Sequence, residues 1–140
     1  MQREEAKVGG RVRAWTAANG VYAGVLEAVV PRRPWRGRVR ITGVIEPACV
    51  YDLTRPRPRR GFRPGDVIEV GGVNIRPLGE GEEGASYLEA LERELARLEE
   101  WEARPAKDPK TAWVPAKALP FIRAAIDEER RRQGGAANDS

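Results

Sequence analysis

Hydrophobic and polar residues alternate through the first half of the chain with the two-residue period of strands that bury one face. In the first such segment, Val12 and Ala14 fall on one face, whereas Arg13 and Trp15 fall on the other. The segments predicted as strands are residues 11–16, 21–30, 38–45, 48–53, 67–70 and 73–78. Their β-branched residues support the same interpretation.

Turn residues separate these segments. Asn19 and Gly20 predict a tight hairpin, because both residues tolerate a positive φ. Gly24 marks a bend inside the second strand. Asp66 is predicted to lie in a turn, where aspartate is common. Five or six short strands with glycine at the bends predict a small, strongly bent antiparallel β-barrel of five strands, because closure would pair most of the strand edges.

The hydrophobic period then changes to the 3.6 residues of helices. In residues 86–101, leucines recur at spacings of three and four residues from Leu88 to Leu98. Ser86 and Glu89 form a capping box at the start of this helix. The leucine seam spans about two heptads, which is marginal for a zipper between chains, so we expect the helix to pack against its own barrel.

A second helix is predicted over residues 116–132, broken near its start by Pro120. A proline-rich linker over residues 105–116 connects the two helices, and the tail over residues 133–140 is predicted to fray. The predicted fold class is therefore α+β, with a five-stranded barrel followed by two C-terminal helices.

The net charge changes sign near residue 80, close to where the hydrophobic period changes. Residues 1–79 hold 15 Lys and Arg against 7 Asp and Glu, a net charge of +8, whereas residues 80–140 carry a net charge of −4. The acids concentrate in residues 80–102. We therefore predict a basic barrel domain over residues 1–79 and an acidic helical appendage over residues 80–140.

Composition excludes several kinds of chemistry. The chain has no histidine, which excludes histidine-based triads and histidine-ligated metals, and its single cysteine, Cys49, lies among apolar neighbours. We expect no enzymatic activity, no cofactor and no metal. No apolar run approaches the roughly 18 residues of a membrane span, and the first ten residues lack a signal peptide. These features predict a cytoplasmic protein.

Two proline-rich loops concentrate arginine around an aromatic residue. Residues 31–38 surround Trp35, and residues 55–63 surround Phe62. Guanidinium groups match phosphate geometry, and an aromatic ring can stack on an unpaired base. The predicted nucleic-acid-binding residues are Arg32, Arg33, Trp35, Arg36, Arg55, Arg57, Arg59, Arg60 and Phe62. We therefore predict a module that binds RNA or another single-stranded nucleic acid.

A second hypothesis is that these arginines pair with the acidic segment over residues 80–102, in the same chain or in a neighbour, or remain solvated. The chain would then be an assembly or adaptor protein. Copies would form a homo-oligomer by joining barrel edges, or by docking the basic barrel of one copy on the acidic helix of another.

Two stretches resemble signatures of the Sm-like (LSm) proteins. Residues 19–26 are similar to the first signature, in which Asn-Gly precedes a strand with a bend glycine and an aliphatic residue, and residues 67–75 are similar to the second, two short strands joined through an Arg-Gly step. The resemblance spans residues 10–78. It implies a strongly bent five-stranded barrel that joins its neighbours edge to edge in a ring and binds RNA without a cofactor. Residues 31–37 and Val70 depart from the family's RNA-contacting residues, so those contacts do not carry over.

Overall fold

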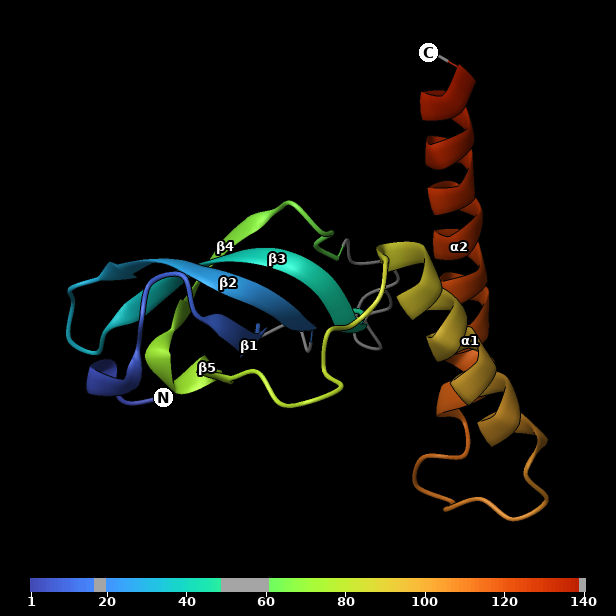
Figure 1. Cartoon of the computed structure of the whole chain (residues 1–140). Coiled ribbons are helices and arrows are strands. Elements are labelled where there is room, and N and C mark those ends of the chain that lie inside the picture. Colours follow the sequence, from blue (N-terminus) through green and yellow to red (C-terminus); the bar gives the residue numbers. More distant parts are fainter. Residues whose placement is uncertain (17–19, 49–60, 139–140) are drawn as a thin grey trace.

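The computed structural model describes residues 1–16, 20–48 and 61–138, which form a β-sheet followed by two helices (Figure 1). The strands are β1 (Arg11–Trp15), β2 (Val21–Val30), β3 (Arg36–Glu46), β4 (Val67–Gly71) and β5 (Ile75–Pro77), and the helices are α1 (Tyr87–Ala103) and α2 (Val114–Asn138). Two short 3-10 helices, η1 (Arg3–Glu5) and η2 (Gly72–Asn74), precede β1 and β5. The predicted α+β class is confirmed.

The five strands form one antiparallel sheet in the order β4-β3-β2-β1-β5. The predicted closure into a barrel is not present, because β4 and β5 remain the two edges of the sheet in the part of the chain that the structure describes. β5 has three residues and ends at Pro77. Proline lacks the backbone N–H that a further ladder would need, so β5 offers little edge for closure.

One face of the sheet supplies the core. Val12 and Ala14 are buried and Arg13 and Trp15 are half-buried, which confirms the alternation predicted for β1. The predicted turn residue Asn19 lies outside the described residues, as does nearly all of the predicted strand at residues 48–53, Cys49 included.

A segment over residues 78–86, here called the crossing segment, runs from β5 to β3, where it pairs with the strand, and leads into α1. Its Ala85 exchanges two backbone hydrogen bonds with Val44, of 2.7 and 2.9 Å. A Cβ atom at Gly43 would overlap the carbonyl oxygen of Glu83. Gly84 adopts a φ of 75°, which favours glycine. These two glycines let the crossing segment lie directly on the strand.

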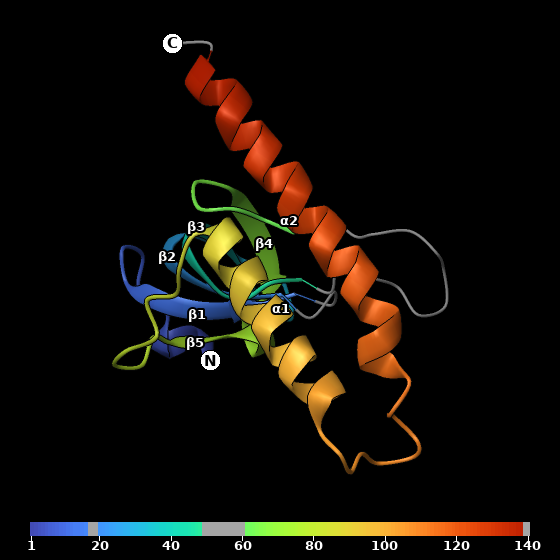
Figure 2. The same cartoon turned by 90° about the vertical axis from the view of Figure 1, so that its right-hand side faces the viewer.

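α1 begins where the sequence predicts. The Ser86 hydroxyl accepts a hydrogen bond of 3.1 Å from the Glu89 backbone N–H, which confirms the predicted N-cap. Leu91 and Leu98 are fully buried, and Leu88 packs partly buried against the same core. Figure 2 shows α1 lying beside α2. Leu91 and Leu98 share one core cluster with Ile122 of α2 and Ile41 of the sheet, so the seam packs within its own chain, against α2 as well as the sheet.

α2 differs from its prediction at both ends. Pro120 does not break the helix, and residues 133–138 continue it instead of fraying. The Pro120 ring is exposed, while Leu119 and Ile122 on either side are buried in the core, so packing outweighs the one backbone bond that proline removes. Once formed, the helix adds a backbone bond for each further residue. Its C-terminal part extends beyond α1 and the sheet (Figures 1 and 2).

The sheet and the helices share one hydrophobic core. Tyr22, Leu26 and Ile41 from the sheet lie in the same cluster as Leu91 and Ile122 from the helices. The acidic helical part is therefore packed on the basic sheet rather than tethered to it.

Candidate functional site

The structure describes five of the residues predicted to bind nucleic acid: Arg32, Arg33, Trp35, Arg36 and Phe62. The other four, Arg55, Arg57, Arg59 and Arg60, lie outside the described residues. Arg36 and Phe62 come from different predicted loops, and both line one groove beside β4. The remaining three occupy the connection between β2 and β3.

Arg32 and Arg33 are exposed at the tip of the β2–β3 hairpin. Neither guanidinium makes an ion pair or a hydrogen bond within the described residues. Their charge is therefore free to meet an anionic partner.

Trp35 is held by the fold. Its indole Nε1 donates a hydrogen bond of 3.2 Å to the Met1 carbonyl oxygen. A Cβ atom at Gly72 would overlap the indole ring, so the first residue of η2 lies directly against it. The ring is half-buried and packs against the core. This arrangement gives Trp35 a structural role that its sequence position did not predict.

β3 presents a row of arginines on its outer face. Arg36 Nε lies 3.0 Å from Glu69 Oε2, and Arg38 Nε lies 3.6 Å from Glu69 Oε1. Arg40 pairs with Glu27 of β2 at 2.7 Å. The hydrogen bond from Arg36 is the main cause that lowers the pKa of the Glu69 carboxyl below its ordinary value. Three guanidinium groups share two carboxylates, so this face keeps an excess of positive charge.

Two tyrosines anchor the chain at Gly61 and Phe62, just before β4. The backbone N–H of Phe62 donates to the Tyr22 hydroxyl, and that of Gly61 donates to the Tyr87 hydroxyl, each at 3.3 Å. Burial raises the pKa of both tyrosines. The Phe62 ring meets Tyr22 edge-on with centroids 6.0 Å apart and is 39% exposed. Phe62 thus remains available to a partner on one side.

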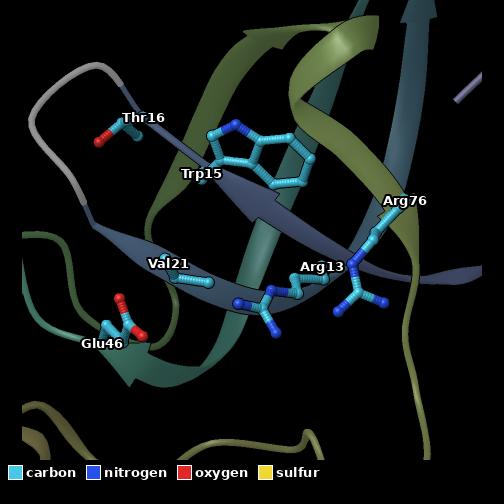
Figure 3. A pocket seen from close by; sticks show the side chains of 6 residues that line it. All are labelled: Arg13, Trp15, Thr16, Val21, Glu46 and Arg76. Atoms are coloured by element: carbon cyan, nitrogen blue, oxygen red, sulfur yellow. The ribbon is translucent and has the colours of Figure 1, made fainter.

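A small pocket of about 360 Å³ lies on the outer face of β1, β2 and β5 (Figure 3). The guanidinium groups of Arg13 and Arg76 lie side by side there. Both donate to Glu82 Oε2 of the crossing segment, from Arg76 at 2.9 Å. Arg13 is the main cause that lowers the pKa of Glu82. The alternation in β1 placed Arg13 on this outer face, but the convergence with Arg76 depends on strand register. One carboxylate oxygen of Glu82 accepts from both guanidinium groups, so the cluster fastens the crossing segment to β1 and β5.

The groove beside β4 has a volume of about 590 Å³. It is lined by Thr16, Arg36, Phe62, Val67, Ile68, Glu69, Val70, Gly71 and Asn74. Val67 is 51% exposed. Because β4 is an edge of the sheet, this groove runs along backbone that no strand pairs in the described part of the chain.

The hydrogen-bond pattern shows which backbone groups face the groove. Gly72 N–H donates to the Trp35 carbonyl, and Ile41 N–H donates to the Asp66 carbonyl. Bonding pairs alternate with non-bonding pairs in an antiparallel ladder. The register between β3 and β4 therefore directs the N–H and C=O groups of Val67, Glu69 and Gly71 away from β3, toward the groove.

Other kinds of site find no support in the described part of the chain. There, no three or more histidine, cysteine, aspartate or glutamate side chains gather as a metal site would require. No helix among the described residues has the length and apolarity needed to cross a bilayer.

No family model matches the chain, and no curated protein matches it. Among solved structures, the X-ray crystal structure of kinase-associated protein B from Bacillus cereus is similar in fold, with a TM-score of 0.65 and 15% sequence identity. The match covers 89% of this chain and 98% of that chain. The sheet with its helical pair is therefore an arrangement that also occurs elsewhere. The Sm-like resemblance stays a prediction.

Proposed function

We propose that the chain is a non-enzymatic adaptor that binds a protein partner along the open β4 edge of its sheet. The observation that carries this proposal is the groove of about 590 Å³ beside β4. Edge strands whose backbone groups are unpaired readily accept an extended segment of another chain. Phe62 and Val67 add exposed apolar surface to the same groove.

The structural neighbour bears on the kind of partner. Kinase-associated protein B carries in its name an association with another protein. For this chain, the shared fold supports a protein partner. The chain also lacks histidine and has one cysteine, which supports a binding role over catalysis.

Binding of RNA or another single-stranded nucleic acid is the second candidate. It is favoured by Arg32 and Arg33, which are exposed and make no side-chain pairs in the described part of the chain. We rank it second because the indole of Trp35 is engaged by the Met1 carbonyl oxygen.

Joining copies of the chain into a ring through β4 and β5 is less favoured. β5 ends at Pro77. The amino group of Met1 also donates a hydrogen bond of 2.8 Å to the Ile75 carbonyl oxygen on this strand. A homo-oligomer would therefore use the β4 edge.

A matched pair of variants tests the proposal. In Glu69→Pro, the ring removes an N–H that faces the groove while the bonds between β3 and β4 remain. Glu69→Ala removes the same carboxylate and keeps the N–H. Circular dichroism and urea unfolding first establish that both variants fold. Each is then used, beside the unmodified chain, to capture partners from nuclease-treated cell extract, with quantitative mass spectrometry as the readout.

The proposal expects a protein that the unmodified chain and Glu69→Ala retain and that Glu69→Pro loses. Capture of the same proteins by all three would overturn the assignment to the β4 edge. For the second candidate, the measurement is the 260/280 nm absorbance ratio of salt-washed protein. Co-purifying RNA that Arg32→Glu with Arg33→Glu abolishes would favour nucleic-acid binding.

A further inference from the structure

We infer, resting on the proposed function, that the β4 edge takes an extended peptide that is apolar on one face and acidic on the other, and that Arg36 selects its acidic face. The peptide would add to the sheet as a sixth strand. Three features of the groove carry this inference: a substitute donor on the edge, an apolar inner wall and a cation on the outer rim.

The substitute donor is Arg36. Its Nη2 donates a hydrogen bond of 3.2 Å to the Glu69 carbonyl oxygen, which faces away from β3. An added strand would present a backbone N–H to this same oxygen. The exposed guanidinium therefore occupies the position of the incoming donor and can be displaced by it.

The inner wall selects apolar side chains. Ile68 and Val70 of β4 point into the core, and Phe62 lies beside them with part of its ring exposed. In a strand added to β4, every second side chain would lie on this face of the sheet. Aliphatic residues at those positions would cover Phe62.

The outer rim selects carboxylates. The remaining side chains of the added strand would lie on the face that carries Glu69 and Arg36. Arg36 reaches across β4 to the free edge, as its contact with the Glu69 carbonyl oxygen demonstrates. Once displaced from there, its guanidinium can pair with an incoming carboxylate. Glu69 would keep Arg38, whose Nε lies 3.6 Å away.

The test uses two synthetic peptides of about seven residues, near the length of an average strand. One alternates glutamate with valine, and the other alternates glutamine with valine. Binding to the full chain is followed by the amide resonances of 15N-labelled protein. The expected result is that the glutamate peptide shifts the amides of Val67, Glu69 and Gly71 and slows their hydrogen exchange. Binding that leaves these three amides unchanged would overturn the inference.

Charge selection is tested with matched variants. Arg36→Gln is expected to weaken binding of the glutamate peptide about tenfold, as for loss of a charge-assisted pair, and not to weaken the glutamine peptide. Arg40→Gln is the control, because Arg40 lies on the same face of β3 but pairs with Glu27 and does not line the groove. Equal effects of the two variants would refute selection by Arg36.

These results separate the two claims. If Glu69→Pro loses a captured partner but Arg36→Gln leaves peptide binding unchanged, the proposed function stands and the acidic-peptide inference fails. If capture does not depend on the N–H of Glu69, the proposed function itself fails.

Discussion

Arg63 and Glu129 fasten the sheet to α2. Arg63 Nη2 lies 2.6 Å from Glu129 Oε2, and Arg63 Nε lies 3.2 Å from both carboxylate oxygens. The Arg63 guanidinium also lies 4.6 Å from the centroid of the Tyr87 ring at the start of α1. One side chain thus joins the segment before β4 to both helices.

Replacing Arg63 should therefore loosen the joint between the sheet and the helices. We expect Arg63→Met to lower the free energy of unfolding by about 2 kcal/mol, because a charge-assisted contact with a buried carboxylate is lost. Urea unfolding measures the change. The control is Arg123→Met, which removes an exposed pair with Glu99 and should cost less than about 0.5 kcal/mol. Equal losses of unfolding free energy in the two variants would show that the Arg63–Glu129 pair stabilises the fold no more than an exposed ion pair does.

Gly43 sets how closely the crossing segment approaches the sheet. We expect Gly43→Ala to lower the free energy of unfolding by about 2 kcal/mol, because its Cβ would overlap the backbone of Glu83 and force β3 and the segment apart. Gly71→Ala is the matched control: it lies at an edge with a negative φ, and its nearest neighbour would be 3.8 Å away. Unfolding curves of the two variants that coincide would contradict the predicted close approach.

Trp35 is expected to behave as a structural residue. Trp35→Phe keeps an aromatic ring but removes the donor to the Met1 carbonyl, so we expect a loss of about 1 kcal/mol in unfolding free energy. Binding of the glutamate peptide should not change, because Trp35 does not line the β4 groove. A variant with unchanged stability and reduced affinity for single-stranded RNA would instead support stacking on this ring.

The elements of the fold were predictable because local patterns determine them. The buried Val12 and Ala14 follow from a two-residue period, and the cap of α1 follows from Ser86 and Glu89, three residues apart. Barrel closure depends on whether β4 meets β5, which no local pattern encodes. The intact helix at Pro120 likewise depends on packing against α1.

The candidate site was only partly predictable. Arg36 and Phe62 stood out as members of arginine-rich loops, and both line the groove. Their partners are distant in sequence: Glu69 lies 33 residues from Arg36, and Tyr22 lies 40 residues from Phe62. A sequence shows that arginines are present, whereas the register of β3 against β4 decides which carboxylate each one meets.

Acid should release the crossing segment through Glu82. The hydrogen bond from Arg13 is the main cause that lowers the pKa of Glu82 in the folded chain below its ordinary value of 4.5. A carboxyl whose pKa is lower in the folded state stabilises the fold above its unfolded pKa, and this contribution is lost as the pH falls through the folded value. We therefore expect the Tm of the unmodified chain to fall more steeply below pH 4.5 than the Tm of Glu82→Gln, so that the two curves converge. Circular dichroism melts between about pH 7 and pH 3 measure this difference.

Glu80→Gln is the control, because Glu80 makes no ion pair within the described residues. A Tm difference between the unmodified chain and Glu82→Gln that stays constant with pH would show that the carboxylate of Glu82 does not fasten the segment.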